Sequence, residues 1–203
     1  MIRQLPDWEV DLVDLPSSKL DMLGDLASDV AAVRAELTRD DGPVAVVAHS
    51  YAGIPVSEAV SGVPGVVHAV CLAAFLPSPG DSLLSMVGTD PSWWTRDTAA
   101  GTINVADPAQ RFYADVAPDL VSAAVDHLRP QSARSFEGRV HGPGLAREAM
   151  TYTVCDADQA IPPVAQQAMG QSCATVVHLD TGHSPMLADP AAVAAVLHDR
   201  LSD

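Results

Sequence analysis

One segment, residues 44–53 (VAVVAHSYAG), constrains the fold more than any other part of the chain. Its first five residues form a short apolar run, which is typical of a buried parallel strand. A serine follows at position 50, flanked by Ala48 and Ala52, with Gly53 next. Small residues around a serine are needed where a strand turns sharply into a helix and exposes the hydroxyl. The segment therefore predicts an α/β fold with Ser50 held at a strand-to-helix turn.

Further apolar runs predict other strands, with helical patterns between them. Strands are expected at Val10–Leu15, Val66–Phe75, Thr151–Cys155 and Thr175–Leu179. Helices are expected at about 20–37, directly after Ser50, at about 163–169 and at about 190–201. Alternating strands and helices favour a mostly parallel sheet, here of about five strands, with helices on both faces.

The stretch from Leu76 to about Ala149 departs from this alternation and is too long for an ordinary loop. We interpret residues 76–149 as a mostly helical cap inserted into a single domain that spans residues 1–203. The cap is expected over the carboxyl ends of the strands, where open α/β sheets bind ligands. A pocket there would be shaped by Trp93, Trp94, Phe112 and His127, although the aromatic residues could equally pack the cap onto the sheet.

Composition and charge exclude several classes of protein. Among 203 residues, 11 Lys and Arg face 26 Asp and Glu, which gives a net charge of −15. Nucleic acids and anionic membranes are therefore not expected as partners, because both require clustered cations. No apolar run approaches about 18 residues, and the three cysteines lack metal-ligand spacing, so we expect a cytoplasmic protein with reduced thiols. Without a phosphate-binding glycine loop or a metal-ligand cluster, no cofactor or metal is expected, and the predicted partner is a small-molecule substrate.

The residues that could activate Ser50 follow the last two predicted strands. A serine hydroxyl is a weak nucleophile that needs a base, and His183 lies in a turn, TGHSPML, after the last strand. An acid to orient the imidazole belongs after the penultimate strand, where Asp156 and Asp158 compete and position alone does not choose between them. The alternatives are a capping role for Ser50 and a structural role for His183. The order serine, aspartate, histidine is that of the α/β-hydrolases.

Several segments together resemble one branch of the α/β-hydrolase superfamily, that of plant methyl esterases, hydroxynitrile lyases and bacterial esterase-like relatives. The resemblance runs from about Trp8 to the C-terminus. It implies that Asp158 is the acid, because the family's acid is the second carboxylate of a Cys-x-x-Asp segment before Ile-Pro. It also implies that the Tyr51 N–H is one donor of the oxyanion hole. The matching segments are AHSYAG at 48–53, LAAFLP at 72–77, LRPQS at 128–132, TYTVCDAD at 151–158 and GHSPML at 182–187.

Two departures from the family pattern affect the expected activity. The family's usual first strand and His-Gly loop, which supplies the other oxyanion donor, have no counterpart before Trp8. Three explanations are open. Either the sequence starts after these elements, or a partner chain fills their position, as in a homodimer. Alternatively, the protein is a natural short form in which the strands ending at Leu15 and Ala48 pair directly. In addition, Ser184 follows the histidine where the lyases have lysine, so lyase activity is not expected.

These observations predict a serine hydrolase of the esterase type that acts on a small, largely apolar ester. Two alternatives remain. The same scaffold could catalyse a cyclisation, elimination or rearrangement with His183 as the base, since fold does not fix function. It could also be a ligand-binding hydrolase homologue without catalysis. Loss of Ser50 would abolish hydrolysis. A reaction that uses His183 as the base would survive loss of Ser50 but not of His183, and a binding protein would show no turnover at all.

Overall fold

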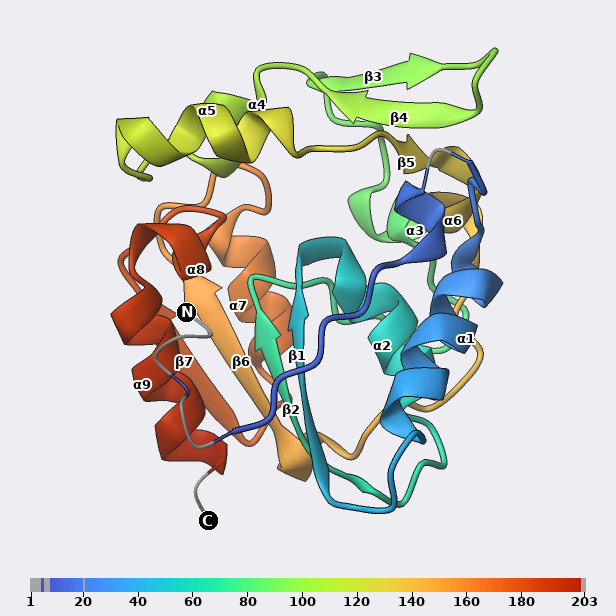
Figure 1. Cartoon of the computed structure of the whole chain (residues 1–203), viewed down its shortest axis with the longest axis vertical. Coiled ribbons are helices and arrows are strands. Elements are labelled where there is room, and N and C mark those ends of the chain that lie inside the picture. Colours follow the sequence, from blue (N-terminus) through green and yellow to red (C-terminus); the bar gives the residue numbers. More distant parts are fainter. Residues whose placement is uncertain (1–4, 6–7, 20, 202–203) are drawn as a thin grey trace.

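A computed structural model describes residues 5, 8–19 and 21–201. Its central sheet is parallel, with the strand order β1-β2-β6-β7 (Figure 1). The expected α/β fold is confirmed, with four strands in the described part of this sheet instead of about five. The strands are β1 (Val44–His49), β2 (Val66–Leu72), β6 (Met150–Cys155) and β7 (Thr175–Leu179).

The strand predicted at Val10–Leu15 does not form, and neither does its direct pairing with β1. The segment is not part of any strand, and Leu12 is 77% exposed. Its two ends pack in different places: Val10 joins the cluster around Val193, whereas Leu15 joins the cluster around Val33. The segment therefore crosses from one side of the sheet to the other and does not run along β1, which leaves β1 at the edge of the sheet.

Helices cover both faces of the sheet, because its buried strands carry apolar residues on both sides. In β2, Ala69 and Cys71 pack in one cluster and Val70 and Leu72 in another, as the alternation of side chains along a strand requires. The clusters pack against different helices, and Figure 1 shows these on either side of the sheet. On one side lie α1 (Leu26–Leu37), α2 (Gly53–Ala59) and α7 (Pro163–Gly170), and on the other α8 (Pro185–Ala188) and α9 (Pro190–Leu201).

Helix α1 begins later than the expected residue 20, which lies outside the described residues. Its start is fixed by a capping box: the Asp25 side chain accepts from the Ser28 N–H at 3.0 Å, and the Ser28 hydroxyl oxygen accepts from the Asp25 N–H at 2.8 Å. Such reciprocal bonds satisfy amides that lack acceptors within the helix. The predicted end at Leu37 agrees with the structure.

The segment 76–149 has more residues in helices than in strands, and it also contains a small antiparallel sheet that the sequence did not predict. The strand order in this sheet is β3-β4-β5. In Figure 1, α4 and α5 lie above the carboxyl ends of β6 and β7, and β3 and β4 lie to one side of them, above α3 and α6. The elements are α3 (Leu83–Val87), β3 (Trp94–Asp97), β4 (Thr102–Val105), α4 (Pro108–Phe112), α5 (Pro118–Asp126), β5 (Gln131–Ser132) and α6 (Ala133–Glu137).

Three single turns of 3-10 helix complete the described elements: η2 (Pro16–Ser18), η3 (Ser50–Ala52) and η4 (Arg147–Ala149). Of these, η3 connects β1 to α2 and carries the predicted nucleophile, and η2 lies against β5 of the cap. Within the described residues, no helix has the length and apolar character that a membrane span requires.

Candidate active site

Ser50 lies at the turn between β1 and α2, in a backbone conformation that few residues adopt. Its φ is +53°, in the left-handed region, which is uncommon for a residue with a side chain and is often found at functional sites. Its carbonyl oxygen accepts from the Phe75 N–H at 3.1 Å. The neighbouring backbone is so close that a Cβ on Gly53 would lie 2.0 Å from the Phe75 oxygen. Glycine at position 53 is therefore required for this turn.

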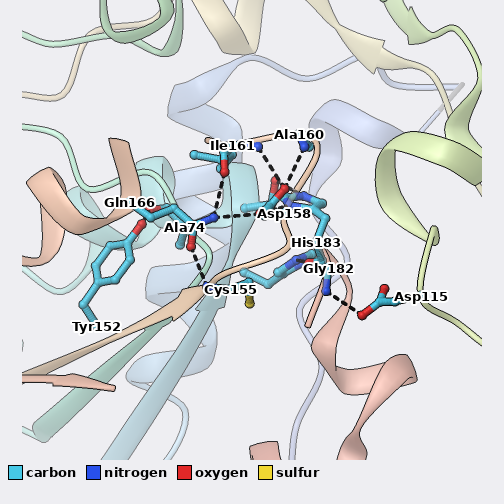
Figure 2. A network of polar contacts seen from close by, with 12 residues as sticks. Ala74, Asp115, Tyr152, Cys155, Asp158, Ala160, Ile161, Gln166, Gly182 and His183 are labelled. Carbon is cyan, nitrogen blue, oxygen red and sulfur yellow. Dashed lines mark hydrogen bonds and ion pairs between the residues drawn. The ribbon is translucent and has the colours of Figure 1, made fainter. Parts of the chain in front are cut away.

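His183 lies in the loop between β7 and α8, and the cap holds this loop in place. The Gly182 N–H donates to Oδ2 of Asp115 at 2.5 Å, between the loop and the segment that joins α4 to α5 (Figure 2). A Cβ on Gly182 would lie 2.4 Å from the other Asp115 oxygen, so a side chain there would displace the carboxyl group. His183 itself is 4% exposed. The loop thus presents a buried imidazole next to Ser50.

The structure brings Ser50, His183 and Asp158 together in a line of hydrogen bonds. The His183 Nδ1–H donates to Oδ2 of Asp158 at 2.8 Å, and the Ser50 hydroxyl donates to His183 Nε2 at 3.0 Å. With its proton on Nδ1, the imidazole has a lone pair on Nε2 facing the serine. This is the geometry in which a histidine can accept the serine proton and an acid can hold the histidine in the required tautomer.

Asp158 is held by three further donors, all from its own loop or from α7 (Figure 2). Oδ1 accepts from the N–H groups of Ala160 at 2.7 Å and Ile161 at 3.0 Å. Oδ2 accepts from Gln166 Nε2 at 2.9 Å. These bonds fix both oxygens of the carboxyl group, and they thereby fix the position of Oδ2, which accepts from His183.

Asp156, the competing acid, turns away from this cluster. Its Oδ1 accepts from Nδ1 of His178 at 2.8 Å, and both side chains of this pair are about half exposed. The same loop thus directs one carboxyl group to the buried imidazole and the other to the surface.

His49, directly before Ser50, forms a hydrogen bond to the loop that carries His183. Its Nε2–H donates to the backbone oxygen of His183 at 2.7 Å, and the two rings lie 4.8 Å apart. Burial of the ring, followed by the repulsion from His183, lowers the pKa of His49 to about 3. His49 therefore stays neutral near pH 7 and keeps the proton on the nitrogen that donates this bond.

A cavity of about 310 Å³ opens above Ser50 and His183, between the central sheet and the cap. The predicted pocket residues Trp93, Trp94 and Phe112 all line it. The Phe112 ring lies 5.1 Å from the His183 ring, and Trp93 meets Phe112 edge to face at 6.1 Å. The remaining lining is largely aliphatic or aromatic, which favours an apolar ligand.

The prediction that His127 belongs to this pocket is wrong. His127 is exposed at the end of α5 and is not among the residues that line the cavity. Its Nδ1 donates to the backbone oxygen of Ala123 at 2.6 Å, within its own helix. The neighbouring Leu128 lines the cavity in its place.

Tyr51 contributes its backbone and its side chain to different parts of the site. Its N–H belongs to the first turn after Ser50, where amides lack an acceptor within the helix. The hydroxyl reaches the other way and donates to Oδ2 of Asp29, a buried residue of α1, at 2.7 Å. Burial, followed by the Asp29 charge, raises the pKa of Tyr51 above its usual range.

The described residues include no group of three side chains suited to bind a metal.

The sequence profile of the alpha/beta hydrolase family matches residues 5–196. The chain belongs to the alpha/beta hydrolase family. A curated relative of this alpha/beta hydrolase is the alpha/beta hydrolase nvfD of Aspergillus novofumigatus (strain IBT 16806). The two are 24% identical over 190 residues, which cover 84% of this chain and 76% of the relative.

Solved structures of two esterases share the fold of this alpha/beta hydrolase. The methylesterase MES16 from Arabidopsis has a TM-score of 0.84 and 19% identity, over 99% of this chain and 90% of that one. Polyneuridine aldehyde esterase has a TM-score of 0.75 and 19% identity, over 91% of this chain and 82% of that one. These likenesses agree with the branch that the sequence motifs indicated.

Sequence patterns did not single out three residues that contact the site. Gln166 holds Asp158, Asp115 holds the histidine loop, and Gln131 lines the cavity. Only Gln166 has a signal in the sequence, as a polar residue in a short apolar helix that follows the acid loop. The adjacent Gln167 carries the same signal, and only the three-dimensional structure separates them.

Proposed function

We propose that this alpha/beta hydrolase is a serine esterase that acts on small, largely apolar esters. The observation that carries the proposal is the line of hydrogen bonds from Asp158 through His183 to Ser50, which ends in an apolar cavity. The esterases among the proteins of similar fold support the choice of esters within the family.

In the first half of the reaction, Ser50 Oγ attacks the ester carbonyl carbon while His183 Nε2 takes the hydroxyl proton. Asp158 stabilises the charged imidazole, and the Tyr51 N–H donates to the oxygen of the tetrahedral intermediate. His183 then gives its proton to the leaving alcohol, and the acyl group remains on Ser50.

In the second half, water attacks the acyl group and His183 takes its proton. The carboxylic acid leaves and Ser50 recovers its hydrogen. Phe112 lies against the His183 ring and helps to exclude water that does not take part in the reaction from the imidazole.

The test is the hydrolysis of a panel of 4-nitrophenyl esters by the wild type, Ser50→Ala and His183→Ala. We expect each variant to lose at least about 10³-fold in kcat. Ser122→Ala and His178→Asn are matched controls, because both residues are exposed and lie outside the site. Hydrolysis that survives in Ser50→Ala would contradict the proposal. A reaction that needs His183 but not Ser50 would identify a non-hydrolytic enzyme that uses the imidazole as a base.

A further inference from the structure

Gln131 of β5 lies in the wall of the cavity that also contains Ser50 and His183. It is one of the few polar side chains in an otherwise apolar lining, together with Tyr51, Asn104 and Arg129. A buried polar group in an apolar wall is costly unless it has a partner, and in ligand sites such groups fix orientation and specificity. The partners of Gln131 therefore bear on which substrates the cavity accepts.

Two serine hydroxyls determine the orientation of the Gln131 carboxamide. Nε2 donates to the Ser17 hydroxyl at 2.5 Å and to the Ser135 hydroxyl at 3.0 Å. The Ser135 hydroxyl donates its own hydrogen to the backbone oxygen of Ser132 at 2.7 Å, so towards Gln131 it can only accept. The nitrogen of the carboxamide must then face the serines, and both of its hydrogens are used.

A buried network behind these serines makes the arrangement rigid. The Ser17 N–H donates to Oδ1 of Asp29 at 2.8 Å, and Oδ2 of Asp29 accepts from the Tyr51 hydroxyl at 2.7 Å. Ser17, Asp29 and Ser135 are completely buried. The Tyr51 hydrogen is thus used inside the protein and is not available to a ligand in the cavity.

Arg129 forms an ion pair through its Nη2 with Oδ1 of Asp14 at 2.5 Å, and a guanidinium group can only donate hydrogen bonds. Within the described part of the chain, no protein group donates to Gln131 Oε1, while the two bonds of Nε2 hold the carboxamide in place. A carboxamide oxygen is an acceptor only, with room for two hydrogen bonds. A ligand that satisfies it must therefore present an O–H or N–H group.

We propose that Gln131 determines substrate specificity by accepting a hydrogen bond from a hydroxyl or amino group of the substrate. The preferred substrates are then apolar esters that carry one such donor away from the scissile carbonyl. This inference rests on the proposed esterase function and names the substrate class more narrowly. A fixed acceptor in an apolar wall favours a substrate that donates to it over an analogue that lacks the donor, because the analogue leaves the acceptor oxygen unpaired.

The experiment compares kcat/KM for methyl phenylacetate with that for its ortho, meta and para derivatives carrying a hydroxyl, an amino group or a fluorine on the ring. The wild type should favour the hydroxyl and amino compounds at one ring position by about 10-fold over the parent. Fluorine at that position, which is small but cannot donate, should give no such gain. This series uses the wild type alone, so it does not depend on how a variant folds.

The variant Gln131→Met keeps the length of the side chain and removes the acceptor. The preference for the donor-bearing ester over the parent should fall to about one in this variant and persist in Asn104→Ala, which alters another polar residue of the same wall. The inference is overturned if no ring position shows the preference, or if the preference persists in Gln131→Met. If the parent ester is cleaved and Ser50 reacts with a fluorophosphonate, such a result removes only the role of Gln131. If neither occurs, the esterase proposal fails and this inference fails with it.

Discussion

Gln166 and His183 donate hydrogen bonds to the same oxygen of Asp158, at 2.9 and 2.8 Å (Figure 2). The Gln166 side chain is completely buried, and its Oε1 accepts from the Cys155 N–H at 3.0 Å, which fixes the orientation of its carboxamide. Helix α7 therefore sets the position of the acid through this one side chain. Gln166 is a positioning residue in the proposed mechanism, because it acts on the imidazole only through Asp158.

Replacing Gln166 by Met should lower kcat by about 10- to 100-fold and leave KM within about threefold, since the substrate does not touch this residue. The free energy of unfolding should fall by about 1–3 kcal/mol, because the Cys155 N–H loses its buried acceptor. Steady-state kinetics and urea unfolding measure the two effects. Gln167→Met, one residue further along the helix, is the matched control. Equal effects of both substitutions on kcat would show that Gln166 has no special role.

The two acids of the loop after β6 should differ sharply in their effect on activity. Asp158→Asn should reduce kcat by about 10³- to 10⁴-fold, because the amide favours the wrong tautomer of His183. Asp156→Asn should change kcat by less than about twofold, since its partner His178 is half exposed and away from the cavity. Ester hydrolysis by the two purified variants measures this difference. A larger loss in Asp156→Asn would mean that the wrong acid has been assigned.

Phe112 should influence both binding and chemistry, because its ring lies against His183 and it lines the cavity. Phe112→Ala should lower kcat/KM for apolar esters by about 10-fold, through lost contact area with the substrate and entry of water. Leu120→Ala on α5 is a suitable control, since Leu120 is exposed and does not line the cavity. A kcat/KM that stays at the wild-type value in Phe112→Ala would exclude the aromatic wall from substrate binding.

His49 should make stability depend on pH. Its pKa is about 3 in the folded state, against an ordinary value of 6.5, because burial disfavours the charged ring. The unfolded chain therefore takes up this proton first, and stability falls as the pH decreases from about 6.5 towards 3, by up to about 1.4 kcal/mol per pH unit.

Chemical denaturation of the wild type and His49→Gln between pH 7 and pH 5 tests this origin. The free energy of unfolding of the wild type should decrease more steeply than that of the variant, so the difference between them changes with pH. A difference that stays constant across this range would show that His49 does not bind the proton on unfolding.

Much of the fold and the close approach of the three site residues could be predicted because they depend on local patterns. Continuous apolar runs mark buried strands, and β7 begins and ends where expected. Loops after neighbouring parallel strands meet at one edge of the sheet, so Ser50, Asp158 and His183 were expected to meet, and they lie within hydrogen-bonding distance.

The parts that could not be predicted depend on distant partners. Val10–Leu15 has the composition of a strand, but among the described residues it forms no ladder with the edge strand β1, and its two ends pack in different clusters. Strand β3 is largely exposed and lacks an apolar alternation, so its pairing with β4 leaves no pattern in the sequence. The distinction between Gln166 and Gln167 depends on the rotation of α7 relative to the acid loop.

The most direct test of the central claim, that Ser50 is an activated nucleophile, is reaction with a fluorophosphonate followed by peptide mapping with mass spectrometry. Attack by Ser50 Oγ displaces fluoride and leaves the phosphonyl group on the serine. We predict one label per chain on Ser50, none in Ser50→Ala, and labelling at least about 10²-fold slower in His183→Ala. A folded wild-type protein in which Ser50 remains unlabelled would contradict the account.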